Sequence, residues 1–212
     1  MTFESERRSR DHYERRAGLY DWANRLASLL RGTSGLRERR KAVKRLRLRP
    51  GQRVLEVSVG TGTNVPLLAE EVGPEGRIVG VDISPAMLER RRRKLERHGL
   101  RADLVLGEAA HLPLAAASFQ AVLHHGGLAE FGDRRGAIEE MVRVAAPGAR
   151  VVICDAGVPA EGKPSLVNRL LLRFQPEYRR PPPLDLLPEG ARDRQLSWFH
   201  GGGWYMIEFE KP

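Results

Sequence analysis

The stretch that decides the fold is residues 54–63, Val-Leu-Glu-Val-Ser-Val-Gly-Thr-Gly-Thr. Its first half is nearly all apolar, which is typical of a strand buried on both faces of a parallel sheet. Its second half is a turn in which Gly60 and Gly62 allow tight bending and the close approach of a ligand. The next residues are expected to begin a helix, whose first N–H groups would point at that ligand. The sequence therefore predicts a strand, a ligand-binding turn and a helix in succession.

Strand-like and helix-like segments alternate along the rest of the chain. The patterns predict strands at 53–59, 77–82, 102–107, 119–124 and 150–155, and helices at 63–72, 85–98 and 133–146. Such alternation favours right-handed crossovers and a doubly wound sheet. Residues 195–200 and 204–210 alternate around three glycines, which indicates an antiparallel hairpin. The predicted class is α/β, with a Rossmann-like, seven-stranded, mostly parallel sheet and a C-terminal antiparallel hairpin.

The glycine turn also resembles that of nicotinamide-dependent oxidoreductases, so this alternative has to be weighed. The dinucleotide fingerprint needs a third glycine to let a pyrophosphate pass, and Val65 stands at that position. Glu56, an acid inside the first strand, is not part of the fingerprint and could hold a cationic amine. Both residues favour a ligand without a diphosphate.

A second acid ends the next strand at Asp82, 20 residues after Gly62. A carboxylate at this interval can accept hydrogen bonds from both hydroxyls of a ribose. Ser84 is expected to cap the following helix, with Pro85 in its first turn. The alternative is an ordinary turn acid, which the combination with the glycine turn makes less favoured.

Residues 56–62, 80–88, 107–113 and 141–155 resemble the successive motifs of class I S-adenosylmethionine-dependent methyltransferases. The most similar branch is the ubiquinone-biosynthesis-like one called methyltransferase type 11. The resemblance implies S-adenosylmethionine as cofactor and a small molecule as methyl acceptor. Its implied cofactor-binding residues are Glu56 at the methionine amino group, Ser58, Gly60 and Gly62 in the turn, Asp82 at the ribose, Ile83 and Met87 beside the adenine, and Glu108 and Ala109 at its amino edge. Ser58 replaces a glycine of the family motif and is small enough to keep the turn.

Two neighbouring histidines, His124 and His125, end the fourth predicted strand, where the acceptor should sit. An imidazole with a near-neutral pKa could act as the general base for a hydroxyl or phenol acceptor. Adjacent strand residues point to opposite faces, so at most one of them is expected to be catalytic. The alternative is that one packs in the strand while the other lines the cofactor cleft without proton transfer.

The surplus of positive over negative charge lies at the beginning of the chain. The 212 residues carry a net charge of +9, and residues 1–49 hold 15 Lys and Arg against 6 Asp and Glu. We expect a single domain made of a basic helical arm or lid (1–49), a cofactor-binding core (50–155) and an irregular segment with the hairpin (156–212). The arm could contact an anionic surface. Nucleic acid is not expected as a substrate, because the Asn/Asp-Pro-Pro-aromatic motif of base-amino methyltransferases is absent.

Several other functions are disfavoured by missing features. Cys154 is the only cysteine and the histidines are scattered, so no metal site is expected. No stretch approaches the ~18 to 20 apolar residues of a membrane span, which favours the cytoplasm. A regulatory or scaffold protein that binds the cofactor without turnover remains an alternative to an enzyme. The sequence does not predict the acceptor or the oligomeric state.

Overall fold

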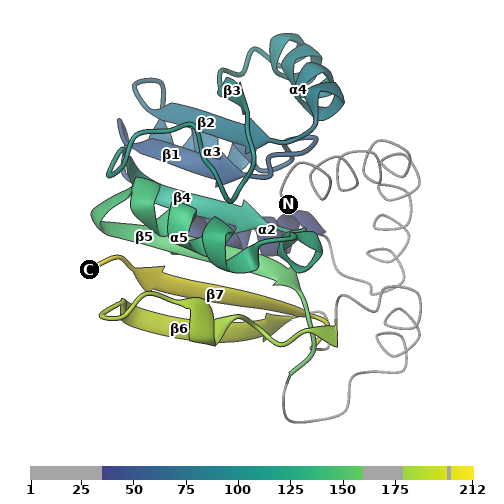
Figure 1. Ribbon diagram of the computed structural model, residues 1–212. Helices are drawn as coiled ribbons and strands as arrows, with labels where there is room; N and C mark the ends of the chain where they lie inside the picture. The colour runs from purple at the N-terminus through teal and green to yellow at the C-terminus, as the bar shows by residue number, and fades with distance from the viewer. Residues whose placement is uncertain (1–34, 160–178, 200–201) are drawn as a thin grey trace.

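The computed structural model describes residues 35–159, 179–199 and 202–212, which build one seven-stranded sheet with helices on both faces (Figure 1). The strand order is β3-β2-β1-β4-β5-β7-β6. The first five strands in this order pair in parallel, and β7 runs antiparallel to β5 and β6. The strands are β1 (Arg53–Val57), β2 (Arg77–Asp82), β3 (Asp103–Leu106), β4 (Phe119–His125), β5 (Ala145–Ala156), β6 (Arg192–Phe199) and β7 (Trp204–Glu210). This topology confirms the predicted Rossmann-like fold with its terminal hairpin.

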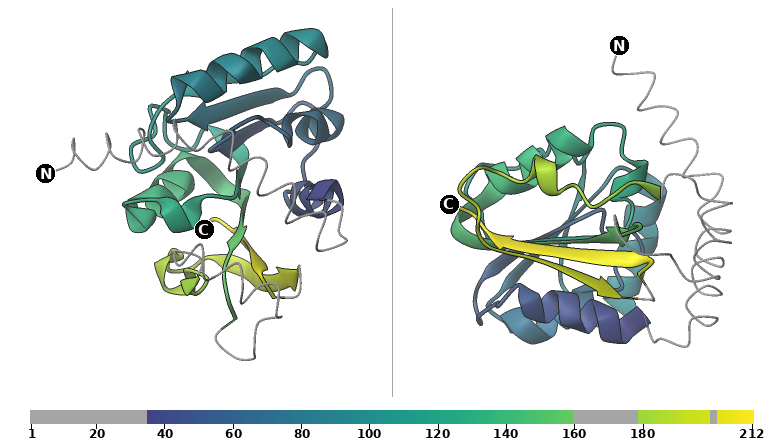
Figure 2. Two further views of the ribbon diagram at one scale, coloured as in Figure 1. Left: turned by 90° about the vertical axis from the view of Figure 1, so that its right-hand side faces the viewer. Right: turned by 90° about the horizontal axis from the view of Figure 1, so that it is seen from below.

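The helices form two layers, one on each side of the sheet (Figure 2). On one side, α2, α3 and α4 pack on a core that includes Val54 of β1 and Leu123 of β4. On the other, α5 packs on a core that includes Leu55 and Val57. Strand neighbours alternate between the faces, so a continuous apolar strand can supply both cores. The helices are α2 (Gly35–Arg45), α3 (Val65–Val72), α4 (Pro85–Arg97) and α5 (Arg134–Val144), with 3-10 turns η1 (Leu128–Glu130) and η3 (Leu184–Leu186).

The strand order reverses direction between β1 and β4. The chain passes from β1 outward to β2 and β3, then returns to place β4 on the other side of β1. In sheets of this kind, ligands bind in the crevice beyond the carboxyl ends of the strands at such a switch point. The segments that follow β1, β2, β3 and β4 all lie at this edge, which we call the ligand edge.

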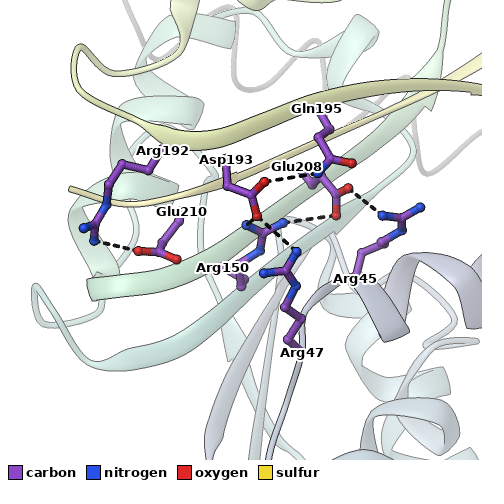
Figure 3. Close-up of polar contacts among 8 residues, drawn as sticks. All are labelled: Arg45, Arg47, Arg150, Arg192, Asp193, Gln195, Glu208 and Glu210. Carbon is purple, nitrogen blue, oxygen red and sulfur yellow. Dashed lines mark hydrogen bonds and ion pairs between the residues drawn. The ribbon is translucent and has the colours of Figure 1, made fainter.

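At the opposite edge, a charge network with a buried centre joins the hairpin to β5 and α2 (Figure 3). Arg150 of β5 lies 3.2 Å from the carboxylate of Glu208 on β7 and 2.6 Å from that of Asp193 on β6. Arg45 of α2 also reaches Glu208, at 3.0 Å, and Arg47 lies 3.0 Å from Asp193. Arg150 and Glu208 are buried, so each charge depends on the other for compensation. The network fixes α2 and the hairpin to the sheet far from the ligand edge.

Most predicted elements end within two residues of the observed bounds. The main correction is β5, which begins at Ala145, directly after α5, instead of at Arg150. Ala145 pairs with Phe119, and a register shift before the next pair, Ala121 with Arg150, accommodates the Pro147-Gly148 turn inside the strand. β6 likewise starts at Arg192 because its pairing with β7 contains an irregularity.

Parts of the predicted arm and of the irregular segment are not described. The basic helical arm expected at 1–49 is described only from Gly35, where α2 begins, so its residues 1–34 lie outside the described part of the chain. Residues 160–178 of the expected irregular segment lie outside it too. Among the described helices, none is both long and apolar enough to cross a membrane.

Candidate functional site

The turn after β1 is built from residues with left-handed backbone angles. The φ angles of Ser58, Gly60 and Gly62 are 60°, 49° and 62°. Such angles are readily adopted by glycine and cost energy in other residues, so Ser58 keeps the turn at some cost. The N–H of Val59 donates to the carbonyl oxygen of Val81 at 2.9 Å, which fixes the turn against β2. The tight turn expected from the sequence is present at the ligand edge.

Asp82, at the end of β2, holds this turn from the neighbouring strand. Its carboxylate accepts hydrogen bonds from the N–H of Gly60 at 2.7 Å and of Ser84 at 3.0 Å. Burial raises the pKa of Asp82, while these two hydrogen bonds act against the shift. Ser84 caps α4 by accepting from the N–H of Met87 at 3.3 Å, as expected. The side chain is therefore held beside the glycine turn, with the helix beginning next to it.

Glu56 is a buried acid near the carboxyl end of β1. One carboxylate oxygen accepts a hydrogen bond of 2.6 Å from the side-chain amide of Asn64, whose own oxygen accepts from Arg39 of α2 at 3.0 Å. The other oxygen, Oε2, is buried and has no partner among the described residues. Burial raises the pKa of Glu56 to about 7, opposed by the Asn64 amide and by the charges of Arg39 and Arg91. The free oxygen can accept a hydrogen bond from a ligand amine.

The remaining predicted cofactor residues lie on the two neighbouring segments of the ligand edge. Ile83 and Met87 are half-buried at the start of α4. Glu108 and Ala109 follow β3, where the N–H of Gly107 donates to the carbonyl oxygen of Asp82 at 3.1 Å. The Glu108 carboxylate lies 3.5 Å from Nδ1 of His111. The topology thus brings all four residues to the end of the sheet where Asp82 lies.

The two histidines differ sharply in surroundings. His124 is fully buried, its ring makes an edge contact with Phe131, and Nδ1 donates to the carbonyl oxygen of Val57 at 3.2 Å. Burial lowers the pKa of His124 to about 4, so its imidazole is neutral near pH 7. His125 is half-buried and lies against Trp204 of β7, with ring centroids 5.5 Å apart. As expected for strand neighbours, they pack against different elements.

Three side chains of the site were not found by sequence reasoning. Asn64 and Arg39 position Glu56; Asn64 is the N-cap residue before α3, and Arg39 lies in α2. Asp155, at the end of β5, is buried and accepts from the N–H groups of Gly127 at 3.1 Å and Ala129 at 2.6 Å. It therefore holds the segment that follows His125. The sequence offered one signal for Asp155, since it is an acid at the end of a buried strand, as Asp82 is. For the contact of Arg39 the neighbouring sequence offered none.

The fold defines a class, a doubly wound α/β protein with two buried acids, Glu56 and Asp82, at its ligand edge. Residues 54–148 match the family model described as a methyltransferase domain. A demethylmenaquinone methyltransferase from Thermus thermophilus is 36% identical over 151 residues, which are 71% of this chain and 67% of that protein. The chain spans about two thirds of the length of the curated relatives that it matches.

Solved structures share the fold at lower identity. A methyltransferase from Aquifex aeolicus superposes with a TM-score of 0.62 and 21% identity, covering 82% of this chain and 89% of that one. The phosphoethanolamine N-methyltransferase 2 of Haemonchus contortus gives a TM-score of 0.76 at 17% identity, covering 96% of this chain and 60% of that one. These likenesses support the architecture, whereas the family rests on the sequence match.

The chain belongs to the class I S-adenosylmethionine-dependent methyltransferases, in the branch of ubiquinone and menaquinone biosynthesis. The cofactor of this family is S-adenosylmethionine. The described residues fit it, because the buried free oxygen of Glu56 matches an ammonium group and the turn of Gly60 leaves room for a close approach. The family assignment favours an enzyme over the nicotinamide-dependent and the scaffold alternatives. No group of three or more metal-binding side chains occurs among the described residues.

Proposed function

We propose that the chain methylates a ring carbon of the reduced, quinol form of demethylmenaquinone. The observation that carries this proposal is the 36% identity to the Thermus thermophilus protein, whose name gives demethylmenaquinone as its substrate. The more general activity, methyl transfer to a small molecule, follows from the family assignment. The quinol form is specified because its hydroxyl groups make the ring carbon electron-rich, as a nucleophile must be.

We propose that the nine predicted residues hold the cofactor. Glu56 would accept from its ammonium group and Asp82 from its ribose hydroxyls, with Ser58, Gly60 and Gly62 as the supporting turn. The remaining four, Ile83, Met87, Glu108 and Ala109, would enclose the adenine. The burial of both acids supports this division. A hydrogen bond to an ionised carboxylate is stronger than one between neutral groups.

An aromatic wall supports a flat acceptor. Trp204 lies 5.5 Å from the ring of His125 and 6.3 Å from that of Phe199, measured between centroids. A Cβ on Gly126 would lie 3.4 Å from the Trp204 ring, so this glycine lets the indole approach the chain. Stacking on aromatic side chains suits a fused aromatic ring. This wall belongs to β4, β6 and β7, at the same edge of the sheet as the segment that follows β1.

The proposed reaction needs alignment and one proton acceptor. S-adenosylmethionine supplies a methyl group on a positively charged sulfur, which is an activated leaving group. The ring carbon forms a bond to that methyl, the carbon–sulfur bond breaks, and the ring carbon then loses its proton. We assign His125 as the base that takes the proton, because His124 is buried against Phe131 and bonded to Val57. Holding the two reactants in line lowers the barrier by several kcal/mol.

The basic arm, residues 1–49, is proposed as a lid over the acceptor that can also contact an anionic surface, with α2 as its anchor on the sheet and the residues before α2 as the covering part. Its surplus of Arg and Lys supports this proposal. The same proposal treats residues 1–212 as one domain in the cytoplasm.

In the test, the purified protein is incubated with labelled S-adenosylmethionine and one of three acceptors. These are a short-chain demethylmenaquinol kept reduced, the matching oxidised quinone, and phosphoethanolamine. We expect label in the product of the quinol alone, identified by mass spectrometry. Transfer to phosphoethanolamine, or to none of the three acceptors, would refute the quinol proposal and leave the family assignment intact. Asp82→Ala serves as a control with impaired cofactor binding.

A further inference from the structure

Arg91 is a charged residue buried where α4 meets the glycine turn. Its side chain is 1% exposed, and Nη1 donates to the carbonyl oxygen of Thr61 at 3.1 Å. Its Nε and Nη2 are buried and have no hydrogen-bond partner among the described residues. A buried guanidinium with two unused donors is costly, unless a ligand completes its hydrogen bonds.

The orientation of the guanidinium shows which of its edges is available. A Cβ built on Gly62 would lie 2.0 Å from Nε, 2.1 Å from Cζ and 2.4 Å from Cδ of Arg91. Nearly equal distances to three bonded atoms mean that this Cβ would lie over the flat face of the group. The guanidinium therefore stacks on the α-carbon of Gly62 and keeps its Nε–Nη2 edge for another partner. Gly62 provides the space for this stacking.

The Nε–Nη2 edge is one that binds carboxylates with two parallel hydrogen bonds. Glu56, within electrostatic reach of Arg91, offers the complementary feature, a buried oxygen without a partner. Together they present two donors and one acceptor around one turn. An α-amino acid group, with its carboxylate and ammonium, has the matching arrangement of charges.

We propose that Arg91 binds the carboxylate of the cofactor's methionine part, opposite the ammonium group held by Glu56. Arg91 thereby distinguishes cofactor molecules with the amino-acid tail from nucleosides that lack it. The bond from Nη1 to Thr61 sets the guanidinium against the turn, and α4 carries it on the same side of the sheet as α2. The inference rests on the cofactor of the family and not on the acceptor, which takes no part in its test.

The first test uses the unmodified full-length protein. Calorimetry measures its affinity for S-adenosylhomocysteine, for the methyl ester of that compound, and for 5′-methylthioadenosine, which lacks the amino-acid tail. We expect the ester, whose carboxylate is neutralised, to bind at least about tenfold more weakly than the acid. If S-adenosylhomocysteine and its methyl ester bind the unmodified protein with equal affinity, the proposal is wrong. Binding of none of the three would overturn the cofactor assignment and, with it, the proposal.

The second test compares Arg91→Met with Arg90→Met, a control at an exposed neighbour on the same helix. Arg91→Met should weaken S-adenosylhomocysteine binding about 10- to 100-fold and change 5′-methylthioadenosine binding less than about twofold. Arg90→Met should change neither. Equal losses for both ligands would show that Arg91 only supports the turn, and would refute carboxylate binding. If Arg91→Met fails to fold by circular dichroism, the acid and ester comparison decides.

Discussion

The two halves of the ligand edge are built by different means. The half formed by β1, β2 and α4 carries the buried charges Glu56, Asp82 and Arg91 beside the glycine turn. The half formed by β4, β5 and β7 carries aromatic rings around Trp204 and the glycines Gly126 and Gly127. A charged ligand group needs partners at fixed distances, whereas a flat apolar ring needs area and exclusion of water. The difference fits the proposal that the charged half binds the cofactor and the aromatic half binds the acceptor.

The halves also differ in how far apart their residues lie along the chain. The predicted cofactor residues fall within 56–109, on consecutive strand–helix units. The acceptor side joins His125 to Trp204, and Asp155 holds the segment after His125 by accepting from Gly127 and Ala129. The cofactor half is thus local in sequence, and the acceptor half depends on the hairpin.

The largest effect should come from Gly60→Val, which breaks the cofactor half alone. Gly60 has a φ of 49°, and its N–H donates to Asp82. A Cβ there meets only the Ser58 carbonyl oxygen at 3.9 Å, so the damage comes from the backbone angle, which a β-branched residue resists. Once the turn rearranges, S-adenosylhomocysteine affinity measured by calorimetry should fall by about 10³-fold or more.

A matched control for this substitution is Gly99→Val. Gly99 has a similar φ of 61° and open space around its α-carbon, but it lies at the far end of α4. It should lower thermal stability and leave cofactor affinity within about twofold. Normal binding by the Gly60 variant would show that the turn has no part in the site.

The next effect separates two adjacent residues of β4. His125→Ala should lower kcat by about 10²- to 10⁴-fold while cofactor affinity changes little, because the proposed base is lost. His124→Ala should instead lower the free energy of unfolding by about 2 to 4 kcal/mol, because it removes a fully buried ring, and leave kcat within about tenfold. The kcat is measured with the proposed quinol as acceptor, and the free energy of unfolding is measured by urea denaturation. A kcat loss below tenfold in the His125 variant would mean that alignment alone suffices.

The same division explains what the sequence could predict. Strand and helix positions and the glycine turn followed from local patterns, because apolar runs and glycines act within a few residues. The β5 boundary was wrong because Ala145 is held by pairing with Phe119, a contact between strands. Arg39, Asn64 and Asp155 were missed as site residues, and so was Arg91, the proposed carboxylate ligand. The contact of Arg91 with the turn, for example, spans 30 positions of the chain, and one arginine among several on α4 gives no sign of it.

A smaller loss is expected from Asp82→Ala. The ribose hydroxyls would lose a charged acceptor, and the N–H of Gly60 would lose the partner that holds the turn. Affinity for S-adenosylhomocysteine should fall by about 1 to 3 kcal/mol. The control Asp103→Ala removes an exposed acid at the start of the neighbouring strand β3, where it pairs with Arg77, and should not affect binding. Equal affinity of the Asp82 variant and the unmodified protein would remove this acid from the site.

The smallest effect concerns the ionisation of Glu56. Its pKa is raised to about 7 from an ordinary value of 4.5, so between these pH values the unfolded chain loses the proton first. The stability of the cofactor-free protein should therefore fall as pH rises through this window and level off above about pH 7. An ammonium group bound at Glu56 favours the ionised carboxylate, so S-adenosylhomocysteine affinity should rise with pH until the same point. The expected rise is up to about tenfold between pH 6 and pH 7.

Glu56→Gln isolates this contribution from those of other acids. Burial also raises the pKa of Asp82, and that of Asp155 to about 6, so both add pH dependence of the same sign to stability. Glutamine keeps an acceptor oxygen for the Asn64 amide and removes the titration. The variant should bind more weakly at pH 8 and lose the part of the pH dependence that Glu56 contributes, as measured by calorimetry across pH 5.5–8. An unchanged pH profile would show that no cofactor charge meets Glu56, and the polar half of the ligand edge would then hold its ligand through Asp82 and the turn alone.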